Sequence, residues 1–243
     1  MTGPANTVMR FRPTLWATVF AVLGVALLLA LGTWQLQRLA WKEAIISERQ
    51  AGFSAEPIGL PEHAEDIPGA LWRRVIITGE FLHDQEIHLA ARSMRGNVGW
   101  HILTPFARET GQIVMVNRGW VPQDRRDPTT RAAGQIQGTV LIEGVATPGA
   151  KESMFSPEND IEGNVWLWAD LPAVAEVLGR TVQPLVVDAA AVDNPGGFPI
   201  GGQTRMNLPN DHFQYALTWY ALAVALAVIY VIYTRRREDE TPG

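Results

Sequence analysis

The chain has 243 residues, a formal net charge of -5 and no cysteine. The lack of cysteine excludes disulfides, thiol redox chemistry and zinc sites built from thiolates. The mild acidity, without any basic tract, gives no support for nucleic-acid binding. Charged residues make up 19% of the chain, which is ordinary for a soluble protein, so the average composition hides how the apolar residues are distributed.

Apolar residues are concentrated in two blocks, at 14–34 and 213–233, and neither block contains Asp, Glu, Lys or Arg. Each is close to the ~20 residues that cross a bilayer as a helix, so we predict transmembrane helices at 14–34 and 210–233. A cleaved signal peptide is the alternative for the first block, because Ala30-Leu31-Gly32 resembles a cleavage site. The block is longer than the ~7–15 apolar residues typical of signal peptides, which favours an uncleaved anchor.

Positive charges set the predicted orientation. Arg10 and Arg12 precede the first block, and Arg235–Arg237 follow the second. The positive-inside rule therefore predicts a cytoplasmic N-terminus at 1–13 and a cytoplasmic tail at 234–243. Residues 35–209 would form an extracytoplasmic domain, periplasmic in a bacterium. No long Arg- and Ser-rich leader precedes the first block, which favours a bacterial plasma membrane over a mitochondrion.

The first helix is expected to continue past the membrane to about Gln50, and 56–70 reads as a loop rich in Pro and Gly. Short runs rich in β-branched and aromatic residues follow, and we expect an exposed excursion at 123–137 and a short helix at 172–178 that Gly179 ends. The predicted fold class is membrane α+β: two transmembrane helices flank one β-rich domain, an antiparallel sheet or small barrel. The expected strands are 72–78, 86–91, 100–106, 113–117, 139–145, 166–169 and 183–187.

His212 is the candidate ligand at the start of the second span. Asn207 or Asn210 would cap this helix, and Pro209 suits its first turn. The imidazole is either an interfacial polar residue or an axial ligand of haem iron. In the second case the small Ala216 leaves room for a macrocycle, and Tyr215 and Trp219 offer flat apolar surfaces.

Trp34, Arg38, Trp41 and Lys42 share one face of the first helix. An aromatic belt with snorkelling cations explains these residues at the end of any span. Their alignment on one helical face is the only hint of a shared partner, either the second helix or a ligand. If haem binds nearby, its propionates could be neutralised by Arg38, Lys42 or Arg205. His83, His88 and His101 lack the tight spacing of a metal site, and no nucleophile, P-loop or dinucleotide motif is present, so we expect no enzyme.

Several motifs together strongly resemble the Surfeit locus protein one family, in order along nearly the whole chain. They are Leu31-Gly32-Thr33-Trp34-Gln35 with Arg38, Val116-Asn117-Arg118-Gly119-Trp120, Trp168-Ala169-Asp170-Leu171 and His212-Phe213-Gln214-Tyr215-Ala216. The resemblance implies an assembly factor for haem-copper terminal oxidases, chiefly cytochrome c oxidase. Bacterial members are linked to binding haem a, with the matching histidine, here His212, as the implicated residue.

By that resemblance the expected cofactor is haem a, bound transiently with His212 on the iron. The residue patterns described above add Tyr215, Trp219, Trp34 and Arg38 as candidate cofactor-binding residues. The expected partners are the large oxidase subunit, the enzymes that make haem a, and the lipid bilayer. The competing hypothesis is a scaffold that stabilises an early oxidase assembly intermediate without handling haem. In that case the Trp and Arg face of the first helix is a surface for helix contacts.

Overall fold

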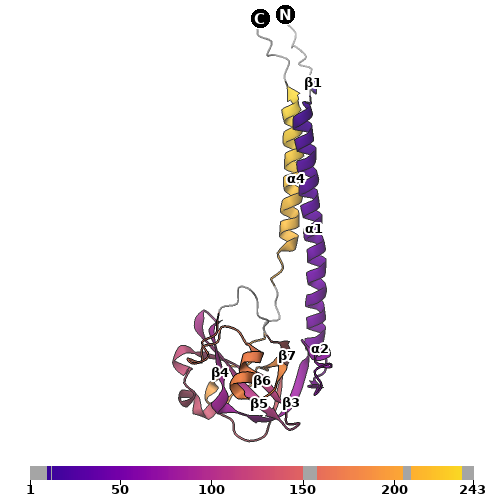
Figure 1. The fold of residues 1–243 in the computed structure, drawn as a ribbon. Coiled ribbons are helices and arrows are strands. Elements are labelled where there is room, and N and C mark those ends of the chain that lie inside the picture. Colours follow the sequence, from indigo (N-terminus) through magenta and orange to yellow (C-terminus); the bar gives the residue numbers. More distant parts are fainter. Residues whose placement is uncertain (1–9, 12, 150–157, 205–208, 237–243) are drawn as a thin grey trace, which may run out of the picture. The chain divides into compact units, whose positions relative to one another are not determined.

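The computed structural model describes residues 10–11, 13–149, 158–204 and 209–236 (Figure 1). The chain divides into two compact units, one formed by both ends, up to Ser47 and from Asn207 on, and one by Glu48–Met206. Four residues named above, Arg12, Arg205, Asn207 and Arg237, lie outside the described residues.

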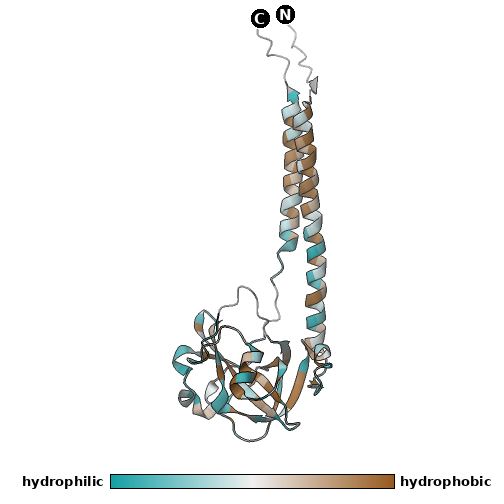
Figure 2. Cartoon of the chain, viewed as in Figure 1, coloured by the Kyte–Doolittle hydropathy of each residue, from teal (hydrophilic) through white to brown (hydrophobic). Residues whose placement is uncertain are grey.

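The unit formed by the two ends contains the long helix α4 (His212–Thr234) and the long helix α1 (Leu15–Ser54) up to Ser47. It also contains the two-residue strands β1 (Arg10–Phe11) and β9 (Arg235–Arg236), which pair antiparallel. Both helices are long and apolar enough to cross a membrane, and only 11% of the most apolar window of each is buried. Figure 2 shows the apolar part of α1 giving way to mixed polarity further along the helix. Helices that are apolar on all sides yet mostly exposed indicate membrane association.

The start of α4 differs from the prediction. The helix begins at His212 with Asp211 as an N-cap residue that makes no side-chain cap bond, so Pro209 and Asn210 precede it. The Asp211 carbonyl accepts the first helical bond, from the Tyr215 amide at 3.2 Å. The Lys42 ammonium instead donates a hydrogen bond to the Pro209 carbonyl. The local sequence pattern does not reveal this contact.

The second unit is a small barrel. Its strands follow the order β2-β3-β7-β8-β6-β5-β4, and a further pairing of β3 with β5 closes β3, β7, β8, β6 and β5 into a ring. The unit also contains the helix α2 (Ile67–Ala70) and four short 3₁₀ segments, η1 (His83–Gln85), η2 (Gln123–Arg125), η3 (Pro128–Gly134) and η4 (Pro195–Gly197). The strands are β2 (Ile58–Gly59), β3 (Arg74–Phe81), β4 (Ile87–Met94), β5 (Asn97–Arg108), β6 (Ile113–Pro122), β7 (Val140–Pro148) and β8 (Val182–Ala189).

The ring confirms the predicted small barrel, the second of the two expected architectures. Its strands are not all antiparallel, because β6 pairs parallel with β8 and β2 pairs parallel with β3. Parallel neighbours need a crossover connection. Between β6 and β8 the chain supplies one, which includes β7 and the helix α3 (Leu171–Leu178). Asp170 caps α3 through the Ala173 amide, and Gly179 ends it in the left-handed conformation, which confirms the predicted helix and its stop.

Side-chain alternation along the strands forms two apolar clusters. Val114 and Val116 of β6 and Val187 of β8 belong to the cluster contributed by all five ring strands. Met115 and Val186, on the opposite faces of the same strands, pack with Val174 of α3. The barrel therefore has a filled interior and a second apolar layer under α3.

Two irregular segments bear on the predictions. Residues 166–169 are not a strand: Trp166 forms only an isolated bridge with Leu89, and its side chain is fully buried under the barrel's outer layer. Tertiary packing rather than sheet pairing explains the apolar run there. Gly119, which follows Arg118, lies at φ +119°, and a Cβ there would come within 1.9 Å of the Ile200 carbonyl oxygen, so this position requires glycine.

Candidate functional site

The two long helices pack along a seam of residues spaced alternately three and four apart. Half-buried or buried residues recur on α1 at Ala21, Val25, Leu28, Gly32, Gln35, Leu39 and Lys42. They recur on α4 at His212, Ala216, Trp219, Ala223, Leu226 and Tyr230. This spacing is that of helices packed as a coiled coil, and the small residues allow close approach of the backbones.

Tyr220 and Tyr230 fix the pairing at two levels. A Cβ on Gly32 would lie 2.8 Å from the Tyr220 ring, so the ring lies against the bare backbone of α1. The Tyr220 hydroxyl is 3.1 Å from the Thr33 hydroxyl, and the Tyr230 hydroxyl is 2.7 Å from the Thr18 hydroxyl. Hydroxyl pairs between helices supply specific contacts where the apolar side chains do not distinguish lipid from protein.

His212 is the first residue of α4, and its imidazole is half-buried in the seam. Its Nδ1 lies 2.7 Å from Oε1 of Gln35 on α1. Its Nε2 has no hydrogen-bond partner among the residues that the structure describes. Lys42, further along α1, binds the Pro209 carbonyl just before α4 begins. Two side chains of α1 thus hold the start of α4.

The other predicted site residues are placed differently. Trp34 and Tyr215 are exposed, at 50% and 56%, and Arg38 is exposed with its guanidinium carbon 4.3 Å from the centroid of the Trp41 ring. Trp219 is half-buried in the seam with His212. Ala216 is only 1% exposed, so the space that the sequence suggested beside it is closed by helix packing.

Sequence reasoning missed Gln35, the residue that contacts the candidate histidine. The signal was present, since Gly32, Gln35, Leu39 and Lys42 continue the alternating spacing that begins at Ala21. The aromatic and cationic residues Trp34, Arg38 and Trp41 drew attention to the neighbouring face instead. That face does not contact α4 through any hydrogen bond among the described residues.

A buried ionic network joins the segment between β6 and β7 to the start of β4. Arg131 forms an ion pair with Glu86, and Nε2 of His88 lies 2.9 Å from Oε1 of Glu86. Arg126 donates from Nε to Nδ1 of His88 at 3.2 Å. Burial raises the pKa of Glu86, but the hydrogen bonds from His88 and Arg131 outweigh burial and bring that pKa below its ordinary value.

A third arginine, Arg118, is buried beside this network and contacts His83. Its Nη1 lies 3.4 Å from Nδ1 of His83, while Nε2 of His83 lies 2.8 Å from the Ile136 carbonyl oxygen. Burial lowers the pKa of His83, and it lowers that of Arg118 to about 10. No group of three or more His, Asp or Glu within the described ranges could hold a metal. His83 and His88 instead form hydrogen bonds within the barrel unit.

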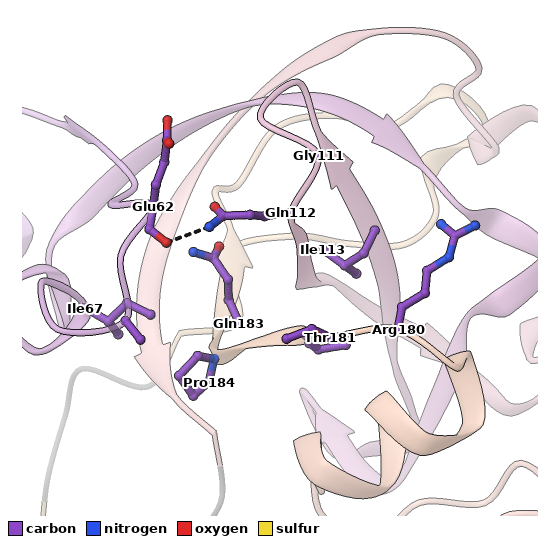
Figure 3. Close-up of a pocket in the computed structure, with 11 residues that line it drawn as sticks. Glu62, Ile67, Gly111, Gln112, Ile113, Arg180, Thr181, Gln183 and Pro184 are labelled. Carbon is purple, nitrogen blue, oxygen red and sulfur yellow. Dashed lines mark hydrogen bonds between the residues drawn. The ribbon is translucent and has the colours of Figure 1, made fainter.

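The barrel also carries an open cavity of about 520 Å³ between the β5–β6 turn and the start of β8 (Figure 3). Its amide side chains are occupied within the protein: Gln112 donates to the Glu62 carbonyl at 2.6 Å, and Gln183 to the Pro61 carbonyl at 3.0 Å. These bonds hold residues 61–62 against the barrel. Among the described residues that line the cavity, none carries a free buried polar group that would select a ligand.

Known proteins match this chain over most of its length, including most of the two long helices and the barrel. The model of the SURF1 family matches residues 22–224, a stretch that includes Gln35 and His212. A SURF1-like protein of Monosiga brevicollis is 38% identical over 225 residues, which cover 88% of this chain and 85% of that protein. Surfeit locus protein 1 of Mus musculus is 37% identical over 87% of this chain and 73% of its own length. The Homo sapiens protein is 36% identical over 82% and 71%.

Proposed function

This chain belongs to the SURF1 family, and from that premise we propose that it is a membrane-bound assembly factor for a haem-copper terminal oxidase. We propose further that it binds haem a and assists its insertion into the large oxidase subunit, as a chaperone and not as an enzyme. The observation that carries the haem proposal is the state of His212. One ring nitrogen is held by Gln35, and the other has no partner among the described residues.

The donor chemistry of this site suits haem iron. A neutral imidazole is a common axial ligand, and ligating histidines usually engage their second nitrogen with a carbonyl or carboxylate oxygen. Haem a would supply the redox centre that the oxidase needs. Trp219 in the seam and exposed Tyr215 one turn from His212 offer aromatic surface to a macrocycle, whereas closely packed Ala216 offers no space. The cofactor would therefore lie beside the helix pair and not between the helices.

A membrane location would suit such a role, because haem a carries a farnesyl tail and dissolves poorly in water. A helix of 40 residues, as α1 is, rises about 60 Å at ~1.5 Å per residue. The hydrocarbon core takes up about 30 Å of that length. We propose that the barrel lies outside the cytoplasm and that both termini are cytoplasmic. The bacterial inner membrane stays a prediction.

Replacing His212 tests the ligand. We expect His212→Ala, purified from cells that make haem a, to lose most of its bound haem and to support little oxidase maturation. His63→Ala, which changes an exposed histidine of the barrel unit, should keep both. Haem is measured by absorption spectrum and extraction. Unchanged haem content in His212→Ala would show that another group ligates the iron.

The scaffold hypothesis also has an observation in its favour, since Trp34, Arg38 and Trp41 form an exposed face on α1. A scaffold without haem would dock the oxidase subunit through this face. Wild-type protein that is haem-free yet copurifies with the large oxidase subunit would support the scaffold and contradict the haem proposal. In that case Trp34→Ala, and not His212→Ala, should abolish copurification.

A further inference from the structure

We propose that Gln35 is a positioning residue, which fixes the tautomer and the ring orientation of His212 so that Nε2 is presented as the iron ligand. This inference rests on the proposed function. It adds to the proposed haem site a residue on the other helix, whose role can be measured without haem.

The hydrogen bond defines the tautomer. Oε1 of Gln35 is a carbonyl oxygen and can only accept, so at 2.7 Å the His212 Nδ1 must carry the proton. A neutral imidazole has one ring proton, and its Nε2 then carries a free lone pair. A metal binds that nitrogen without first displacing a proton.

Helix packing holds Gln35 in place. Its side chain is half-buried in the seam, one turn after Gly32, whose bare backbone lies against the Tyr220 ring. On the other side, Lys42 binds the Pro209 carbonyl and fixes the chain that leads into α4. The pair of Gln35 and His212 lies between these two contacts, so the imidazole is held from both directions along the helix.

The choice of an amide has a consequence for release. A carboxylate in this place would draw the Nδ1 proton toward itself, make the imidazole a stronger ligand and hold iron more tightly. The neutral carbonyl of Gln35 orients the ring with a smaller effect on ligand strength. This suits a carrier that must give the cofactor up.

The first test reads the tautomer in the protein without haem. The chain has only 5 histidines, so ¹⁵N-labelled histidine in the full-length protein in lipid bilayers gives few NMR signals, and His212→Ala assigns the relevant one. We expect the Nδ1–H form in the wild type and a shift toward Nε2–H in Gln35→Leu. Gln37→Leu changes an exposed glutamine of the same helix and should leave the signal unchanged. An Nε2–H form in the wild type would overturn the proposal.

The second test reads haem affinity and release. Loss of an outer partner of a ligating histidine typically weakens metal binding by about 10–100-fold, and we expect Gln35→Leu to fall in this range while Gln37→Leu does not. Gln35→Glu should retain haem more tightly than the wild type, lower its reduction potential and slow its transfer. If His212→Ala loses haem but all three variants bind it as the wild type does, the positioning role is wrong and the ligand assignment stands. If His212→Ala keeps haem, the proposed function fails first.

Discussion

Two buried carboxyl groups in the barrel have pKa values shifted in opposite directions. Glu86 accepts from Arg131 and from His88, and its pKa lies below the ordinary range although burial acts against this. Among the described residues no cation lowers the pKa of Asp188 in this way: burial raises that pKa, and the hydrogen bonds from Asn117 and Thr204 only partly oppose the effect. A neighbouring positive charge decides which effect dominates.

These directions predict how stability depends on pH. Because the pKa of Glu86 is lower in the folded than in the unfolded protein, its contribution to stability is complete above its ordinary pKa near 4.5 and is lost as the pH falls through the folded value. Glu86→Gln leaves Arg131 buried without a counter-charge, so we expect a loss of roughly 3–5 kcal/mol at pH 7. The difference from the wild type should shrink at acid pH. Tryptophan fluorescence of the full chain during urea unfolding measures both.

Glu143→Gln is the matched control for this change. Glu143 pairs with Arg74 across β7 and β3, but both side chains are about one-third exposed, at 36% and 35%. Solvent screens such pairs, and their loss typically costs about 0–1 kcal/mol. Equal losses in the two variants, or a Glu86→Gln penalty that persists at acid pH, would contradict the assignment of Glu86 as a buried anion.

At the scale of elements, the seam between α1 and α4 depends on the bare backbone at Gly32. A Cβ at this position would lie 2.8 Å from the Tyr220 ring, and valine would add two further methyl groups. We expect Gly32→Val to separate the helices at this level. The chain has no cysteine, so a short bifunctional maleimide can join cysteines introduced at Val25 and Ala223, and the crosslinked fraction should fall severalfold.

The control for the seam is Ala30→Val. Ala30 is exposed and lies off the seam, although it belongs to the same apolar stretch of α1. It should leave the crosslinked fraction unchanged, because a larger apolar side chain there meets no part of α4. If Gly32→Val crosslinks as well as Ala30→Val, the close approach at Tyr220 is not what holds the pair together.

The sequence predicted most elements because their patterns are local. Two apolar helices, the extension of the first past its apolar block, α3 with its glycine stop and the main strands all follow from composition, periodicity and turn residues. The strand predicted at 166–169 was wrong because Trp166 is buried through packing, and burial and sheet pairing produce the same apolar signal. The parallel pairing of β6 with β8 depends on contacts distant in sequence, which no local pattern contains.

The candidate site was predicted only in part, for the same reason. His212 stands out as an imidazole at a helix start, and a single residue type suffices to notice it. Gln35, which His212 contacts, is 177 positions away in sequence, and the contact depends on the register of the two helices. Gly32 and Ala216 are closely packed at that register, although Ala216 was expected from the sequence to leave room for a macrocycle.

At the scale of the whole molecule, the charges that flank the two helices predict on which side of the membrane the barrel lies. Arginines lie next to the start of α1 and the end of α4, at Arg10 and Arg235–Arg236 among the described residues. The positive-inside rule predicts that both of these ends lie in the cytoplasm. Arg38 and Lys42 lie at the other end of the first apolar block and weaken the contrast. Long domains translocate largely regardless of their charge, so the flanking arginines should decide the orientation.

Single cysteines in the cysteine-free chain test this directly in intact bacteria. A cysteine replacing Glu162, exposed on the barrel unit, should react with a membrane-impermeant maleimide added outside the inner membrane. One appended after Gly243 should react only after the cells are permeabilised. The reverse pattern would place the barrel in the cytoplasm, and with it the start of α4. His212 would then meet haem from the cytoplasmic side, and delivery to the oxidase would have to occur at that surface.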